Sequence, residues 1–207
     1  MHVAEDHIIQ TGGNLTKPLS RGILMRIWRK LFSREGSKMG PFEPKSRLDS
    51  LQFDASEWIL IWLALNNQSP VRGKTAFVKE LFITGKEKVP SIDQTFQFFG
   101  HRFGPYSKVF ERNLSSLVSS EMMTETPNNE SRGLDTDTPI RLDYTLTEKG
   151  VAYANELIEK IPPFERNVLG NWKRVLSKMG LWGLLRYVYS NYPEYTMSSE
   201  ILLELES

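Results

Sequence analysis

The sequence predicts a mainly α-helical domain with a short two-stranded hairpin, and two motifs about forty residues apart indicate it. Phe103-Gly104-Pro105-Tyr106-Ser107 opens one segment with apolar residues at helical spacing, and Tyr144-Thr145-Leu146-Thr147-Glu148-Lys149-Gly150 joins an alternating strand to another helix. Tyr144 and Leu146 fall on one face of the strand because side chains alternate with period two, and Thr147 offers an oxygen that caps the helix. A strand entering a helix in this way predicts the wing of a winged helix-turn-helix domain.

The first fifty residues differ in composition from the rest of the chain. Residues 1–20 lack periodicity and contain two glycines and a proline, which is typical of a mobile N-terminus. Residues 21–35 are expected to form a basic amphipathic helix, with an apolar stripe of Ile23, Leu24, Ile27, Trp28, Leu31 and Phe32 and with Arg26, Arg29, Lys30 and Arg34 off that stripe. Glycines and prolines in residues 36–51 predict a linker.

Residues 52–195 are expected to form the winged-helix domain. Asp54 and Glu57 predict the start of a helix whose middle, Trp58 to Leu65, is apolar on every side and therefore central to the core. A second helix is expected from about Gly73 to Ile83, and a third after Pro90, with a capping box of Ser91 and Gln94 and an apolar stripe of Ile92, Phe96, Phe99 and Phe103. A fourth begins at Ser107 and is expected to bury Phe110, Leu114, Leu117 and Val118.

The wing and the last helices follow. Met123 to Thr126 and Ile140 to Leu146 are expected to pair antiparallel across a polar loop, with Leu142, Tyr144 and Leu146 facing inward and Arg141 and Asp143 in solvent. A helix from Thr147 to Ile161 is stopped by Pro162-Pro163, and two more helices lie on either side of Gly180. Residues 196–207 are assigned to a C-terminal tail.

These elements resemble a known family. The features are Gly73-Lys74-Thr75 entering a helix, Phe103 to Ser107, the wing exit from Tyr144 to Gly150, and Tyr187-Val188-Tyr189-Ser190-Asn191-Tyr192-Pro193 near the end. In this order they resemble the YwgA-like winged-helix proteins of prokaryotes, especially archaeal members, and more distantly the Panacea domain of SocA-like antitoxins. The resemblance covers about residues 52 to 195 and implies a helical winged-helix fold, with DNA or a protein as partner.

Composition excludes several classes of site and of protein. The chain has no cysteine among its 207 residues, which excludes disulfides and thiolate metal sites. The longest apolar run, Trp58 to Leu65, is far shorter than the roughly 20 residues that span a bilayer, and the polar, acidic N-terminus does not read as an export signal. We therefore expect a cytoplasmic protein.

The residues that catalysis or a cofactor needs are scarce. The three histidines are His2 and His7 near the N-terminus and His101 among phenylalanines, so no metal triad or nucleophile–base pair is proposed. Gly73-Lys74-Thr75 lacks the first glycine of a phosphate-binding loop, because Gln68 stands at that position, and is interpreted as an ordinary helix start. The sequence predicts no enzyme, no cofactor and no metal site.

DNA binding by a transcriptional regulator is the favoured function, because the helix that begins at Ser107 takes the place of a recognition helix. The candidate DNA-binding residues are Lys108, Arg112, Ser115 and Ser116 on that helix, Arg132 in the wing, and Arg26, Arg29 and Lys30 in the N-terminal helix. Carboxylates around Arg132 oppose contact with a polyanion, since residues 121–150 carry three basic and seven acidic groups. The alternative is a non-catalytic protein-interaction module, such as an antitoxin-like or complex-assembly subunit.

Partners follow from the same features. Residues 1–50 carry nine basic and five acidic groups, so the N-terminal helix is able to add phosphate contacts to those of the domain. Its apolar stripe is expected to pack on its own core or on a second subunit, another protein or an anionic membrane surface being the other choices. A homodimer on duplex DNA is expected, because a two-fold protein matches a palindromic site.

Overall fold

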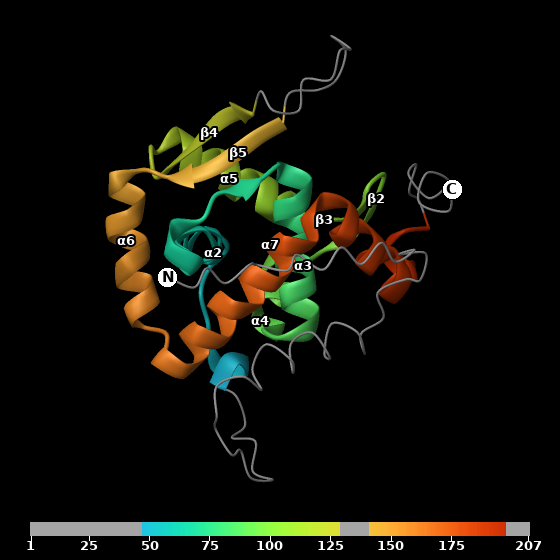
Figure 1. Ribbon diagram of the computed structural model, residues 1–207, viewed down its shortest axis with the longest axis horizontal. Helices are drawn as coiled ribbons and strands as arrows, with labels where there is room; N and C mark the ends of the chain where they lie inside the picture. Colours follow the sequence, from blue (N-terminus) through green and yellow to red (C-terminus); the bar gives the residue numbers. More distant parts are fainter. Residues whose placement is uncertain (1–46, 129–140, 198–207) are drawn as a thin grey trace, which may run out of the picture.

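The computed structural model describes residues 47–128 and 141–197, and this part of the chain is mainly helical with small antiparallel sheets (Figure 1). Its helices are η1 (Arg47–Ser50), α2 (Ala55–Gln68), α3 (Lys74–Glu87), α4 (Pro90–Phe96), α5 (Lys108–Ser119), α6 (Glu148–Glu159), α7 (Pro163–Asn191) and η3 (Pro193–Tyr195). Its strands are β1 (Val71–Arg72), β2 (Phe99–His101), β3 (Gly104–Tyr106), β4 (Met123–Asn128) and β5 (Arg141–Leu146). Their apolar side chains share one core.

The central element is α2, which contacts α5, α6 and α7 and lies in the middle of the molecule (Figure 1). The predicted capping box is confirmed: Asp54 accepts a 2.8 Å hydrogen bond from the Glu57 N–H, and Glu57 accepts one of 2.9 Å from the Asp54 N–H. Every side chain from Trp58 to Leu65 is buried, as predicted. The regular helical backbone of α2 ends before Asn66 and Asn67, whose φ angles are positive, a conformation that asparagine tolerates better than most residues.

The larger sheet has the strand order β1-β5-β4, so β5 lies in the middle. Strands β4 and β5 pair antiparallel, with Met123 opposite Leu146 and Asn128 opposite Arg141, and Val71 of β1 lies opposite Tyr144. The antiparallel pairing predicted for these two segments is confirmed. The two-residue strand β1 has no counterpart in the prediction, because so short a segment has no detectable period.

The two faces of β5 agree with the prediction only in part. Tyr144 is buried, and Leu142 and Leu146 pack against the core. Arg141 and Asp143, however, are not left in solvent: Arg141 Nε lies 3.4 Å from Asp143 Oδ1, and both side chains are largely covered, 33% and 18% exposed. Strand β1 occupies the second edge of β5 and leads into Gly73, which lies against the Arg141 side chain, and Asn128 of β4 donates a 2.6 Å hydrogen bond to Asp143.

The third predicted helix is wrong beyond Phe96. The helix α4 ends there because Gln97 takes a left-handed conformation, and the chain continues into the hairpin β2–β3, where Phe99 and Phe103 are exposed. The predicted capping box is also absent, since Val89 is the N-cap and Ser91 Oγ donates instead to the Leu51 carbonyl at 2.6 Å. The four-three-four spacing of apolar residues therefore spanned a helix and a hairpin.

The remaining helices follow the predicted order. Thr147 caps α6 through a 3.0 Å hydrogen bond from the Gly150 N–H, and a Cβ at Gly150 would lie 1.8 Å from the Met122 carbonyl oxygen, which explains the glycine of this motif. Gly180 has φ +62° and divides α7 into two helical parts, as the sequence predicts. The helix α3 extends four residues beyond its predicted end, to Glu87.

Residues near both ends of the domain belong to the core. Leu48 and Leu51, which the sequence prediction placed in a linker, are 3% and 7% exposed, and Thr196 of the predicted tail is buried as well. Residues 36–46 of the predicted linker, residues 129–140 between β4 and β5, and residues 198–207 of the predicted tail lie outside the described residues, as do the predicted mobile N-terminus and the basic helix expected over residues 21–35. None of the helices described combines the length and the apolarity needed to cross a membrane.

Candidate functional site: a basic cavity at the start of α5

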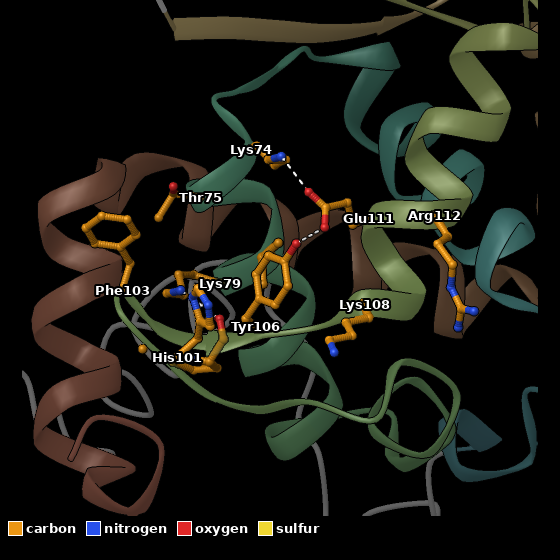
Figure 2. A pocket seen from close by; sticks show the side chains of 12 residues that line it. Lys74, Thr75, Lys79, His101, Phe103, Tyr106, Lys108, Glu111 and Arg112 are labelled. Atoms are coloured by element: carbon orange, nitrogen blue, oxygen red, sulfur yellow. Dashed lines mark hydrogen bonds and ion pairs between the residues drawn. The ribbon is translucent and has the colours of Figure 1, made fainter. Parts of the chain in front are cut away.

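A cavity of about 710 Å³ lies where α3, the β2–β3 hairpin and the start of α5 meet (Figure 2). Four basic residues line it, Lys74 and Lys79 from α3 and Lys108 and Arg112 from α5, together with His101 of the hairpin. Among the described residues, Glu111 is the one acidic residue in its lining. Positive charge therefore predominates in this cavity, and the chemistry it offers is the binding of anions.

Two hydrogen bonds of Ser107 hold the start of α5 in place. The Ser107 hydroxyl accepts a 3.0 Å hydrogen bond from the Phe110 N–H and donates to the Phe96 carbonyl at the end of α4. Ser107 is fully buried, while Lys108 and Arg112 are exposed one turn apart. The free N–H groups of a helix start add partial positive charge beside these two cations.

A short chain of contacts neutralises Glu111. Tyr106 Oη donates to one carboxylate oxygen of Glu111, and Lys74 Nζ lies 3.1 Å from the other (Figure 2). The hydrogen bond from Tyr106, followed by that from Lys74, lowers the pKa of the Glu111 carboxyl, so it stays ionised. Burial and Glu111 together raise the pKa of Tyr106 to about 12, so the phenol keeps its proton. The Glu111 charge is therefore compensated by Lys74, and Lys79, Lys108 and Arg112 remain in excess.

Lys79 is the least accessible cation of the cavity. Its side chain is 2% exposed, and Nζ donates a 2.8 Å hydrogen bond to the Pro105 carbonyl. An ammonium has three N–H donors, and among the residues described no carboxylate pairs with this one. Burial lowers the pKa of Lys79 to about 7, so charged and neutral forms are both populated at neutral pH.

The hairpin closes over Lys79 at Gly104. Gly104 has φ +79°, and a Cβ there would lie 3.4 Å from the Tyr189 ring and 3.6 Å from Lys79 Cε. Beside this turn the His101 and Tyr106 rings lie 5.0 Å apart at an interplanar angle of 30°, and Phe103 is 47% exposed. The Phe103 to Ser107 motif thus supplies aromatic side chains that line the cavity, the tight turn of the hairpin at Gly104, and the N-cap of α5 at Ser107.

The sequence-predicted site residues fall into three groups. Lys108 and Arg112 line the cavity, whereas Ser115 and Ser116 are exposed further along α5 and do not. Arg132, Arg26, Arg29 and Lys30 lie outside the described residues. The structure therefore brings together two of the eight predicted residues.

Sequence reasoning missed Lys74, Lys79, Tyr106 and the role of His101. Gly73-Lys74-Thr75 begins a helix, as the sequence predicts, but Lys74 and Thr75 also line the cavity. A signal for Lys79 was present, since this lysine stands between Val78 and Leu81 on a helix whose neighbouring positions are buried. A charged residue inside an apolar stripe is seldom buried without a partner or a role.

No protein-family model matches this chain, and neither does any curated protein. The resemblance to YwgA-like and Panacea proteins therefore stays a prediction from the motifs.

Proposed function

We propose that this chain is a winged-helix protein that binds duplex DNA through the N-terminal half of α5. The order α2, β1, α3, α5, β4, β5 with β5 in the middle of the sheet supports a winged helix, with α4 and the β2–β3 hairpin inserted between the two helices of the helix-turn-helix. In that arrangement α5 is the second helix of the pair, which reads the major groove.

The single observation that carries the proposal is the excess of cations at the start of α5. Lys108 and Arg112 are exposed there one turn apart, and Lys74 neutralises the one carboxylate in the cavity lining beside them. Recognition helices place base and phosphate contacts near their N-terminal end. The exposed hydroxyls of Ser115 and Ser116 continue this face along the helix and are able to donate to phosphates or base edges.

The described part of the wing contributes little to phosphate binding. The basic residue of its strands, Arg141, is paired with Asp143, and Glu125 of β4 is exposed. Carboxylates near a polyanion weaken its binding. The DNA contacts are therefore expected from α5 and not from β4 and β5.

The test is a fluorescence-anisotropy titration of labelled duplex DNA over a series of salt concentrations. The Lys108→Ala/Arg112→Ala variant is expected to bind more weakly and to flatten the plot of log affinity against log salt by about two, because two phosphate contacts are lost. Lys178→Ala/Arg186→Ala is the matched control, since it removes the same charge from exposed positions on α7. Equal losses of DNA affinity in both variants, or no loss in either, would contradict the assignment of the DNA contacts to α5.

The second candidate is a non-catalytic interaction module, and exposed apolar residues on α7 favour it. Leu181 and Trp182, which directly follow the break at Gly180, are 38% and 56% exposed, and tryptophan is enriched among residues that dominate protein interfaces. A wild-type protein that shows no salt-dependent affinity for duplex DNA would support this function instead. Light scattering on the same sample measures whether the chain is a homodimer, as expected for a regulator.

A further inference from the structure

The cavity has an excess of positive charge, and part of it lies beneath the surface that DNA would contact. Glu111 is paired with Lys74, which leaves Lys108 and Arg112 at the mouth and Lys79 deeper inside. Lys79 Nζ uses one of its three donors on the Pro105 carbonyl, within the part of the chain described. A buried ammonium with a single neutral partner is costly in an isolated fold, and an anion in the cavity would compensate it.

The depth of Lys79 limits what can reach it. Its side chain is 2% exposed, whereas Lys108 and Arg112 are exposed. A phosphate of the DNA backbone is attached to a wide duplex and contacts cations on the surface. An anionic group that pairs with Lys79 must instead belong to a molecule small enough to enter the cavity.

The walls and the size indicate more than a bare anion. Val78 and Pro105 are apolar, Phe103 is half exposed, and the His101 and Tyr106 ring centroids lie 5.0 Å apart with the ring planes tilted by 30°. The volume of about 710 Å³ lies within the range of roughly 300–1,000 Å³ that is usual for pockets that bind organic ligands. Aromatic side chains beside buried and exposed cations are suited to bind a flat ring that carries an anionic group.

We propose that this cavity binds a small organic anion, a phosphate or carboxylate group attached to a flat ring. The anionic group accepts hydrogen bonds from Lys79 and from Lys108 or Arg112, and the ring lies against Phe103 and the His101–Tyr106 pair. Because Lys108 and Arg112 serve both ligands, the small anion competes with DNA, and this last consequence rests on the proposed DNA-binding function.

The protonation state of Lys79 agrees with such a ligand. Burial lowers the pKa of this ammonium to about 7, and a bound anion favours its charged form, so binding takes up a proton above that pH. The other titratable or charged groups around the cavity are Lys74, His101, Tyr106, Lys108, Glu111 and Arg112, with Tyr189 of α7 against the Gly104 turn. Phenyl sulfate keeps one negative charge over the whole pH range, so any pH dependence of its binding comes from the protein.

Isothermal titration calorimetry of the full chain without DNA tests the site. Phenyl phosphate and benzoate are expected to saturate, and phenol and inorganic phosphate to bind at least tenfold more weakly, because each lacks one of the two recognised groups. Lys79→Met should weaken phenyl phosphate roughly tenfold or more, as a lost charge-assisted hydrogen bond requires. Lys178→Met, an exposed change on α7, is the control and should leave affinity unchanged.

A second variant keeps the test informative if Lys79→Met fails to fold. Phe103→Ala changes an exposed hairpin residue and should weaken phenyl phosphate while leaving inorganic phosphate unchanged. Absence of saturable binding by any probe, or full affinity in both variants, would overturn the proposal.

Competition is measured separately, by adding phenyl phosphate to the DNA complex. Lys79→Met is expected to retain DNA affinity and to lose the competition. Failure of DNA binding alone, with phenyl phosphate still bound, would overturn the proposed function and leave the ligand site standing.

Discussion

Lys79 and Lys173 are both buried lysines, yet their surroundings differ. Lys173 Nζ donates to the carbonyls of Leu63, Leu65 and Ser69 at 3.3, 3.0 and 3.0 Å, and it faces the buried carboxylate of Glu80. Lys79 Nζ donates to one carbonyl and faces a cavity. Burial lowers the pKa of both, that of Lys173 to about 8, opposed by Glu80, and that of Lys79 to about 7. Lys173 therefore uses its N–H donors within the fold, whereas Lys79 has N–H donors left for a ligand.

The position of Lys173 explains why its partners are structural. It binds carbonyls where α2 ends, next to Asn66 and Asn67 with their positive φ angles, and these groups would otherwise lack donors. Glu80 in turn accepts a 2.7 Å hydrogen bond from Trp62 Nε1 and one of 3.1 Å from Ser177 Oγ. The network joins α2, α3 and α7, so Lys173 holds the core together.

The largest expected effect is that of Lys173→Met on stability. This change removes the charge beside Glu80 and three hydrogen bonds at once, so the free energy of unfolding should fall by about 3–5 kcal/mol. Lys79→Met removes a desolvated ammonium that has one hydrogen-bond partner. The free energy of unfolding of this variant should stay within about 1 kcal/mol of the wild-type value or exceed it. Urea unfolding of both variants measures the two values. Equal losses would contradict the distinction between the lysines.

The stability contribution of Lys79 should depend on pH. Between its folded pKa of about 7 and the unfolded value of 10.5, the unfolded chain binds more protons at this residue than the folded chain. Its contribution to the free energy of unfolding therefore rises with pH in that window, by at most about 1.4 kcal/mol per pH unit.

The measurement for this prediction is the difference in unfolding free energy between Lys79→Met and wild type at pH 6, 7.5 and 9. The unfolding free energy of Lys79→Met should exceed that of wild type most at pH 6, and the difference should shrink progressively above pH 7, since the wild-type lysine then becomes neutral. A difference that stays constant with pH would mean that Lys79 titrates alike in both states.

Gly104→Ala tests the turn that covers Lys79. A left-handed φ of +79° costs an alanine about 1–2 kcal/mol, and its methyl would contact Tyr189 and Lys79. Thermal unfolding should show this loss, and phenyl phosphate should bind more weakly because the turn shifts. Gly170→Ala is the matched control, since Gly170 has open space around its Cβ position, and it should not destabilise the protein.

The smallest expected effect is that of Ser107→Ala, which removes the cap of α5. Loss of an N-cap costs about 1 kcal/mol, and the Phe96 carbonyl loses its donor as well. Denaturation should show that loss, and hydrogen exchange should accelerate at the Phe110 amide. Unchanged protection at Phe110 would mean that packing alone holds the start of α5.

Local patterns predicted most of the helices, because capping and apolar periodicity are local properties. Asp54 with Glu57, and Thr147 as a cap, marked helix starts that the structure confirms. The prediction failed where one spacing suited two structures: Phe99 and Phe103 continued the helical period of Ile92 and Phe96, but the left-handed Gln97 ends the helix between them. The predicted exposure of Arg141 and Asp143 was wrong because the contacts of these side chains come from neighbouring segments, Gly73 after the two-residue strand β1 and Asn128 of β4, that the pattern of β5 alone does not reveal.

The candidate site was harder to predict, since it depends on contacts between distant segments. Lys108 and Arg112 could be selected from their place on one helix, but the cavity also needs Lys74 and Lys79 from α3 and His101 from a hairpin that the sequence pattern did not predict. The pairing of Lys74 with Glu111 joins residues 37 positions apart. No periodicity within a single element contains that information.

The most direct test of the central claim, that Lys79 is kept for an anionic ligand, is nuclear magnetic resonance of the full chain with ¹³C-labelled lysine. The lysine signal that disappears in Lys79→Met should titrate near pH 7 in the free protein and at higher pH with saturating phenyl phosphate. The signal that disappears in Lys173→Met should not respond to the ligand. A Lys79 signal that titrates near pH 10.5, as an exposed lysine does, or that does not shift with phenyl phosphate, would show that Lys79 is not an anion ligand.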